Sequence, residues 1–288
     1  MSGFAPSAGP SGVPRFALGC ARIGSVLTPL DRGACVALIE EAYDLGVRHF
    51  DTASVYGQGD SERYIGEALH GHRDKVVLSS KAGQRLPARQ LLMAQFKPAL
   101  RWVASHRRGL RERIAVQRHA GIPRCFEPDY VERSLHASLR RLRTDYLDIF
   151  YLHSPSVAAL DDERLFERIQ NLRELRMFRL FGVSCDDPEV AWRAATHDAV
   201  QVVQFAFDDS ADSDELLAEL ARQGKRAVVR GFRPQPASGA RAHGSLDAQL
   251  HRALHYPAVG DVILGTTNPS HLRANYAAYR EALAACER

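Results

Sequence analysis

The chain has little of several features that would assign it to a membrane, a secretory route or a metal site. Its 288 residues contain no apolar run near the roughly 18 residues that span a bilayer. The opening MSGFAPSAGPSGVPRF lacks the apolar core of a signal peptide. The five cysteines are odd in number and have no metal-ligand spacing. We therefore expect a cytoplasmic protein with reduced thiols, no membrane contact and no bound metal, with residues 1–14 as a disordered lead-in.

Acidic residues are nearly absent from one segment. Residues 85–124 hold ten Lys or Arg and one acid, Glu112, which gives +9; since the chain carries +4, the remainder carries about −5 (4 − 9). Phe96 and Trp102 are not interleaved regularly with the basic residues, so we expect no nucleic-acid partner. Two interpretations stay open for the segment: a lid or substrate wall, and a solvated helical excursion.

The chain also lacks the GxGxxG turn that would follow the first strand of a doubly wound dinucleotide-binding sheet. Instead, apolar runs alternate with helical patterns eight times, which predicts one (β/α)₈ barrel, the TIM-barrel class of α/β fold, over residues 1–288. A long, basic, helical insertion at 84–128 follows the third strand, on the expected catalytic face. The expected strands are 16–19, 48–51, 76–80, 147–152, 180–184, 202–205, 227–230 and 262–264. The expected helices are 32–45, 61–70, 129–141, 162–173, 188–196, 212–223, 246–255 and 269–284.

Four polar residues fall where the expected strands end or just beyond. Asp51, Lys81 and His153 close the second, third and fourth strands, and Tyr56 lies in the loop after Asp51. Each alone has a structural explanation, such as a turn cap, a rim aromatic, a solvated strand end or a satisfied histidine. Because adjacent strands bring their ends to one rim, we expect the four together to form a site.

These four groups suit the movement of a proton on an oxygen. The usual pKa of a tyrosine, about 10, is too high for efficient proton exchange near neutrality. We expect Lys81, held in place by Asp51, to lower the pKa of Tyr56. His153 would then donate to a substrate carbonyl oxygen and orient it. The set contains no nucleophile and no electron carrier.

Several phrases resemble, in order, the signatures of the aldo-keto reductases. They are FDTASVYGQGDSERYIGEAL, VVLSSK, SLHASLRRLRTDYLDIFYLHSP, FGVSC and ILGTTNPSHLRAN, and with the first strand they extend over about 16–275. The resemblance implies a (β/α)₈ barrel that binds a nicotinamide dinucleotide without a GxGxxG motif. It also implies that Asp51, Tyr56, Lys81 and His153 are catalytic, with Tyr56 protonating a carbonyl oxygen as hydride arrives or deprotonating an alcohol in the reverse direction.

The resemblance further implies where the dinucleotide binds, and here the chain departs from the family. Ser184 and Cys185 stand where the family has Ser-Asn against the nicotinamide carboxamide, and a thiol replaces an amide poorly. Gln204 matches the third carboxamide contact, and Phe232 is the candidate aromatic stacking partner. Where family members that prefer NADP have basic residues around the 2′-phosphate, this chain has Gly265, Thr266, Thr267, Asn268 and His271, and Asn275 matches the residue that contacts adenine. With Arg273 close by and free amides at the start of the last helix, we expect NADP(H) ahead of NAD(H).

The expected function is NAD(P)(H)-dependent interconversion of a carbonyl and an alcohol on an aldehyde, ketone or aldose, by a monomer or small homo-oligomer. The pattern YGxGxSExxxGxAL is similar to the bacterial branch that contains the aldose dehydrogenases. A basic insertion over the site would favour anionic or heavily hydroxylated substrates. The alternative is a catalytically weak cofactor-sensing or interaction protein that kept the barrel, as family members that serve as channel subunits did. Cys185 suits the alternative, and the four intact catalytic residues argue against it.

Overall fold

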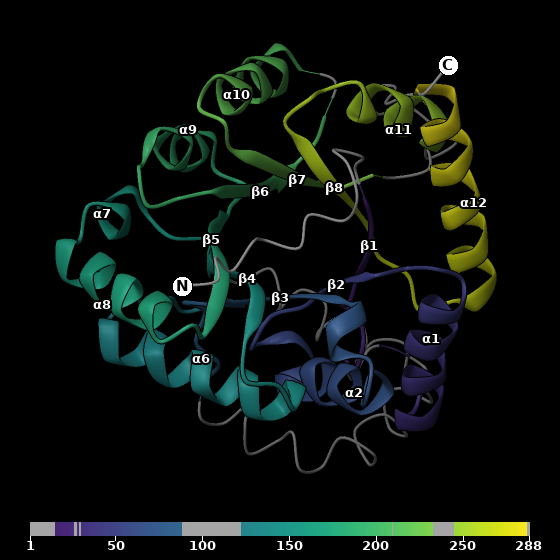
Figure 1. The fold of residues 1–288 in the computed structure, drawn as a ribbon, viewed down its shortest axis with the longest axis horizontal. Coiled ribbons are helices and arrows are strands. Elements are labelled where there is room, and N and C mark those ends of the chain that lie inside the picture. The colour runs from purple at the N-terminus through teal and green to yellow at the C-terminus, as the bar shows by residue number, and fades with distance from the viewer. Residues whose placement is uncertain are drawn as a thin grey trace, which may run out of the picture.

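Eight parallel strands close into a barrel in chain order (Figure 1). A computed structural model describes residues 15–25, 28, 30–87, 122–208, 210–232 and 245–286. Each strand pairs with the next in the parallel sense, and β8 pairs with β1. The predicted (β/α)₈ barrel is therefore confirmed. The strands are β1 Arg15–Gly19, β2 His49–Asp51, β3 Val77–Ala82, β4 Leu147–His153, β5 Phe178–Ser184, β6 Val202–Ala206, β7 Arg226–Arg230 and β8 Val259–Leu264.

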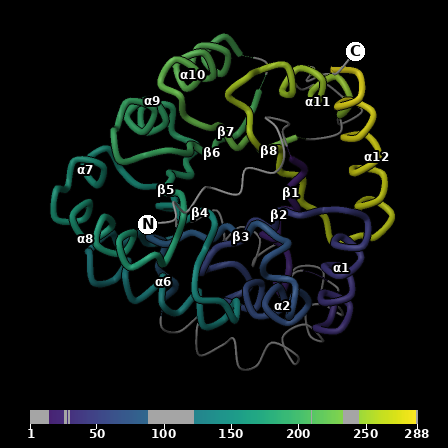
Figure 2. Tube along the Cα trace, viewed as in Figure 1, coloured from purple at the N-terminus to yellow at the C-terminus, as the bar shows by residue number. Residues whose placement is uncertain are grey.

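Helices surround the barrel, and α12 closes the ring beside α1 (Figures 1 and 2). Every expected strand and helix is present, with ends that differ by up to three residues. Two 3₁₀ turns, η1 and η2, and the short helix α7 were not expected. The helical elements are α1 Arg32–Asp44, η1 Tyr56–Gly59, α2 Asp60–Ala68, η2 Arg73–Lys75, α6 Pro128–Leu142, α7 Val157–Leu160, α8 Glu163–Glu174, α9 Pro188–Thr196, α10 Ala211–Arg222, α11 Leu246–Leu254 and α12 Pro269–Cys286.

Local sequence sets where many of these helices begin. A short polar side chain stands just before the helix and accepts a hydrogen bond from a first-turn backbone amide, which has no partner within the helix. The capping residues are Asp31, Ser156, Asp162, Asp187, Ser210 and Ser245. These caps fix the residue at which each of these six helices begins.

The barrel strands are buried on both faces. Strands β2, β3, β4 and β8 are buried at every position, because helices cover their outer side and side chains fill the interior. The interior apolar cluster consists of Ala17, Ile149, Tyr151, Val202, Val228 and Ile263. Polar side chains that point into such an interior must find partners there, and this requirement organises the site.

The basic insertion is described only at its two ends. Residues 88–121 and the lead-in 1–14 lie outside the described residues. Gln84 and Arg124 form an antiparallel bridge, and the backbone amide of Cys125 donates to Gly83 O over 2.7 Å. The chain therefore leaves and returns at the carboxyl end of β3, beside the strand ends that carry the candidate site.

Candidate active site

Three of the predicted site residues meet at the carboxyl ends of β2, β3 and β4. Lys81 Nζ donates to Asp51 Oδ2 over 2.5 Å and to the backbone oxygen of Thr52 over 2.8 Å. Both charged side chains are almost completely buried. His153 ends β4, the next strand of the barrel. The strand order thus brings the carboxylate, the ammonium group and the imidazole to one rim.

Tyr56 reaches the same rim from a tight turn. The sequence predicted a loop, but Tyr56 begins the 3₁₀ turn η1. The turn is shaped by Gly57, whose φ is 54° and whose missing side chain leaves room for the backbone of Gly24: a Cβ there would come within 2.8 Å of it. The Tyr56 ring lies edge-on to His153, with centroids 5.8 Å apart and an interplanar angle of 86°. Lys81 Nζ lies 5.3 Å from the centroid of the Tyr56 ring.

The buried surroundings set the charges of Asp51 and His153. Burial alone would raise the pKa of Asp51, but the charge and hydrogen bond of Lys81, with His49 and Gln204, lower the pKa below its usual value. Burial, reinforced by the positive charge of Lys81, lowers the pKa of His153 to about 3. Asp51 is therefore ionised and His153 uncharged at neutral pH. The buried His153 Nδ1 has no hydrogen-bond partner among the described residues.

The predicted shift of Tyr56 is wrong in direction. Burial raises the pKa of Tyr56, and the opposing charge of Lys81 reduces this rise without reversing it, partly because Asp51 counters Lys81. A buried cation that already has a carboxylate partner exerts a weaker net field on a third group. The phenol is consequently protonated at neutral pH.

A hydrogen-bonded chain under the site was not predicted. Asp51 Oδ1 accepts from Ser79 Oγ over 2.9 Å. Ser79 Oγ lies 2.9 Å from His49 Nε2, and His49 Nδ1 lies 3.1 Å from Asp261 Oδ1. Asp261 in turn accepts from Arg15 at the opposite end of the barrel. The signal in the sequence was an acid inside an otherwise apolar strand, VGDVIL, and a histidine two residues before Asp51.

The helix after Tyr56 is fastened by two buried polar side chains, also not predicted. Ser61 was expected to open that helix, which begins at Asp60. The buried hydroxyl of Ser61 donates to Cys20 O over 3.0 Å and lies 2.8 Å from Thr52 Oγ1. The fully buried Glu62 accepts from Ser80 and from Arg141, each over 2.6 Å. These bonds tie α2 to β1, β2, β3 and α6, and so they fix the turn that carries Tyr56.

Ser184 and Gln204, which were predicted to contact the nicotinamide, lie at the ends of β5 and β6 and are hydrogen-bonded to each other. Ser184 Oγ donates to Gln204 Oε1 over 2.7 Å, and Gln204 Nε2 donates to Asp51 Oδ1 over 2.9 Å. Cys185 is buried, and burial raises the pKa of its thiol to about 12. Phe232 packs near Phe207, with ring centroids 6.0 Å apart. Gln204 therefore belongs to the network around Asp51 as well as to the predicted cofactor set.

At the start of α12 the expectation of free amides is wrong. Pro269 has no amide hydrogen, and Asn268 Oδ1 accepts from the amides of Ser270 and His271 over 2.8 and 3.4 Å. Arg273 is paired with Glu41. The remaining predicted residues, Gly265, Thr266, Thr267 and Asn275, lie between the end of β8 and the second turn of α12, with only Thr266 buried.

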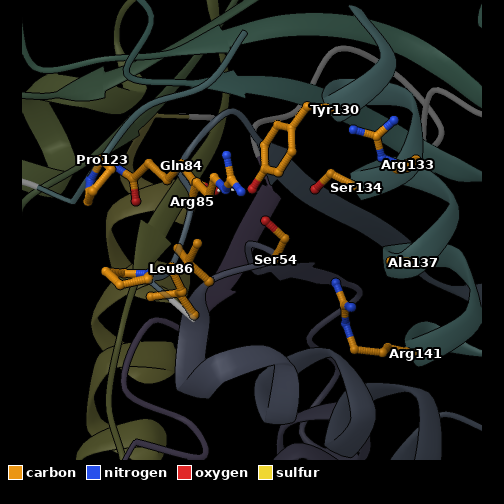
Figure 3. Close-up of a pocket in the computed structure, with 12 residues that line it drawn as sticks. Ser54, Gln84, Arg85, Leu86, Pro123, Tyr130, Arg133, Ser134, Ala137 and Arg141 are labelled. Atoms are coloured by element: carbon orange, nitrogen blue, oxygen red, sulfur yellow. Dashed lines mark hydrogen bonds between the residues drawn. The ribbon is translucent and has the colours of Figure 1, made fainter. Parts of the chain in front are cut away.

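A cavity of about 580 Å³ lies beside the site, between the loop after β2, the ends of the insertion and one face of α6 (Figure 3). Ser54 and Val55, just before Tyr56, form one wall, and the amide of Ser54 donates to Lys81 O over 3.1 Å. The other residues that line the cavity are Gln84, Arg85, Leu86, Pro87, Pro123, Tyr130, Arg133, Ser134, Ala137 and Arg141. The cavity adjoins the candidate site without including its four residues.

Three further features concern the cysteines, metal sites and membrane helices. All five cysteines lie in the described part of the chain, and none of them forms a disulfide there. Among residues 15–25, 28, 30–87, 122–208, 210–232 and 245–286, no three His, Cys, Asp or Glu side chains gather as a metal site, and no helix has the length and apolarity to cross a bilayer.

Fold and site together define a (β/α)₈ barrel protein with an acid–base cluster at the carboxyl ends of its strands. Residues 15–230 match the Aldo/keto reductase family. The chain therefore belongs to this family of oxidoreductases.

The individual relatives share about a quarter of their aligned residues with this chain. The chain is 27% identical to D-threo-aldose 1-dehydrogenase of Pseudomonas sp over 72% of this chain and 61% of that protein. It is 23% identical to pyridoxal 4-dehydrogenase of Microbacterium luteolum over 94% of this chain and 91% of that protein. An aldo/keto reductase from Klebsiella pneumoniae in complex with NADP and acetate shares the fold, with a TM-score of 0.66, 23% identity, and 96% and 91% of the two chains covered. For the first three curated relatives, the matches span 47%, 41% and 61% of the relative's length.

Proposed function

We propose that this protein interconverts a carbonyl and an alcohol by hydride transfer with NADP(H) or NAD(H), and that Tyr56 exchanges the proton with the substrate oxygen. The observation that carries the proposal is the buried Lys81–Asp51 pair next to Tyr56 and an uncharged His153. These groups can give a proton to an oxygen and stabilise the charge that develops there.

Each of the four side chains has a separate task in this scheme. The raised pKa of Tyr56 keeps the phenol protonated at neutral pH, which is the form that donates to a carbonyl oxygen. Lys81 stabilises the phenolate that remains, and Asp51 holds Lys81 in place. His153, being neutral, donates an N–H to the carbonyl oxygen without losing its own proton. Oxidation of an alcohol needs the phenolate, so we propose that carbonyl reduction is the favoured direction.

The hydride in this chemistry is supplied or accepted by the nicotinamide dinucleotide when it is bound. The end of β8 suits such a group, because Gly265 is exposed bare backbone and the neighbouring side chains are hydroxyls and amides that can bond a carboxamide, ribose or phosphate. The residues proposed to hold it are Ser184, Cys185, Gln204, Phe232, Gly265, Thr266, Thr267, Asn268, His271 and Asn275. We place NADP(H) ahead of NAD(H) because the related K. pneumoniae structure contains NADP.

The proposed substrates are small polar aldehydes, ketones or aldoses. This class follows from the relatives named D-threo-aldose 1-dehydrogenase and pyridoxal 4-dehydrogenase. The Ser54 hydroxyl and the partly exposed Gln84 beside the rim offer hydrogen-bonding groups for such substrates.

The test is to titrate the protein with NADPH and NADH by fluorescence and to screen aldehydes and aldoses for a change in cofactor absorbance. Tyr56→Phe should lower turnover by roughly 10²- to 10⁴-fold with cofactor affinity retained. The matched control is Tyr146→Phe, which removes a phenol oxygen bonded to Arg179 away from the rim. Full activity in Tyr56→Phe would refute the assigned role. Cofactor binding without turnover on a broad panel would instead favour the cofactor-sensing alternative.

A further inference from the structure

We propose that the cavity beside Tyr56, named here the arginine cavity, binds an anionic group of the substrate, a carboxylate or a phosphate ester. This inference rests on the proposed function, since it assigns a substrate class to the same site. A volume of about 580 Å³ lies within the usual range of small-molecule sites.

The described lining of the arginine cavity has an excess of positive charge. Three arginines line it, and no Asp or Glu is among the described lining residues. Arg141 is neutralised by the buried Glu62. Arg85 and Arg133 form no ion pair within the described residues and are exposed, so both are free to pair with an anion. Arg133 also borders a hollow lined by several acids, which leaves Arg85 as the stronger anchor.

The other groups in the cavity support the same assignment. All three arginines act electrostatically on the phenol of Tyr130, whose pKa is nevertheless raised by burial. That phenol donates to Gln84 O over 2.9 Å, and the Arg85 guanidinium lies 5.9 Å from its ring centroid. Figure 3 shows the Ser54 and Ser134 hydroxyls facing the same space. Hydroxyl and guanidinium donors together match the oxygens of an anion.

The location links this anion site to the chemistry. Ser54 is two residues before Tyr56, and its backbone is bonded directly to Lys81. The proposal therefore requires that a substrate with its carbonyl at Tyr56 extends past Ser54 and places an anionic end near Arg85. Such a contact would favour charged over neutral carbonyl compounds of the same size.

The experiment compares 4-carboxybenzaldehyde with benzaldehyde as substrates. The measured quantity is the ratio of their kcat/KM values in the wild type, in Arg85→Gln, in Arg133→Gln and in the double variant. We expect the wild type to prefer the charged aldehyde and the double variant to lower the ratio by roughly 10- to 100-fold. Arg140→Gln is the matched control, because Arg140 is exposed on the same helix and does not line the cavity. Absence of a preference, or a ratio unchanged in the double variant, overturns the proposal.

A direct binding measurement separates this proposal from the proposed function. If neither aldehyde is turned over, calorimetric titration with benzoate decides: binding by the wild type that is lost in the double variant supports the anion site while the proposed function fails. No benzoate binding by the wild type overturns the anion site.

An independent observation concerns the protons inside the barrel. We propose that His49 carries a proton on both ring nitrogens and so acts as a positioning residue for Asp51. His49 is fully buried between two carboxylates. It contacts Asp261 directly and is linked to Asp51 through the hydroxyl of Ser79. The other charged or titratable side chains that act on this interior include Arg15, Cys20, Lys81, Asp148, Tyr151, His153 and Arg226.

The count of protons leads to this assignment. Asp261 accepts from the guanidinium of Arg15 and Asp51 accepts from the ammonium group of Lys81, so both carboxylates are ionised and only accept. The links from Asp261 to His49, from His49 to Ser79 and from Ser79 to Asp51 are 2.9 to 3.1 Å long, and each needs one proton. The Ser79 hydroxyl has one proton to give. The ring of His49 must therefore supply the other two.

Nitrogen-15 NMR of the labelled full-length protein tests this state. Both His49 ring nitrogens should show the protonated signature at pH 7, and a neutral ring overturns the proposal. In the enzyme assay, His49→Gln should lower kcat about tenfold with KM little changed, whereas the control His72→Gln, on a partly exposed histidine, should not. If KM rises and kcat is kept, His49 does not act through Asp51.

Discussion

The half of the barrel from β1 to β4 and the half from β5 to β8 hold their polar residues differently. In the first half, Asp51, Lys81 and His153 are buried at the strand ends. The ion pair there is hydrogen-bonded to Ser79 and Thr52 of the same half and to Gln204 of β6. In the second half, Cys185 is a buried thiol at a proposed dinucleotide position, Asn268 caps its own helix, and Arg273 is paired with Glu41. The acid–base groups are thus pre-organised, whereas the proposed dinucleotide groups would have to exchange partners when a dinucleotide binds.

The largest effect should come from breaking the buried ion pair of the first half. Lys81→Met leaves Asp51 charged and unpaired, which should lower the free energy of unfolding by about 3–5 kcal/mol and turnover by at least roughly 10²-fold. Urea denaturation and kcat measure the two effects. Lys75→Met, on an exposed lysine before the same strand, is the control. The double variant Lys81→Met/Asp51→Asn should recover stability without activity; recovery of both would contradict the proposed role.

The pH dependence of stability should also be set by the first half. The pKa of His153 is about 3 in the folded protein and 6.5 ordinarily, so the unfolded chain binds more protons between these pH values. Stability should therefore fall as pH decreases from about 6.5 toward 3, by at most about 5 kcal/mol from this group. The ionised Asp51 adds to the loss at the acid end of that range. Thermal unfolding across this range, compared with His153→Gln, measures the contribution; equal slopes in both proteins would contradict the assigned burial.

A smaller effect is expected from introducing an amide in the second half. Cys185→Asn should tighten dinucleotide binding by up to about tenfold, because one added hydrogen bond contributes about 0.5–1.5 kcal/mol. Dissociation constants for NADPH from fluorescence titration check this, with Cys185→Ser as the size-matched control. Weaker binding in Cys185→Asn would show that the buried site does not admit the larger side chain, and that the difference between the halves lies elsewhere.

The smallest effect is expected at Arg273. Since Arg273 is paired with Glu41, Arg273→Gln should change the ratio of NADPH to NADH affinities by less than about threefold. Glu41→Gln releases the guanidinium and should shift the ratio toward NADPH. A large loss of NADPH affinity in Arg273→Gln would mean that the arginine leaves Glu41 to bind the 2′-phosphate.

The sequence predicted the fold well because its signals are local. Each strand is a short apolar run, and several helices follow an Asp or Ser cap, so eight repeats could be counted without tertiary information. The convergence of Asp51, Lys81 and His153 followed from their places at strand ends, since parallel neighbouring strands must end on one rim. Tyr56 was placed near that rim, although its turn was not predicted.

Long-range electrostatics and hydrogen bonding could not be obtained from the sequence. The direction of the Tyr56 pKa depends on how deeply the phenol is buried and on how far Asp51 already neutralises Lys81. The hydrogen-bonded side chains that run from Arg15 to Asp51 include partners that are 246 positions apart in the sequence. Similarly, Glu41 contacts Arg273 only because the ring of helices closes. Sequence periodicity and strand ends thus determined the architecture and the members of the acid–base cluster. Their charge states and partners were decided by tertiary structure, because solvation and Coulomb interactions depend on distances that only the closed barrel defines.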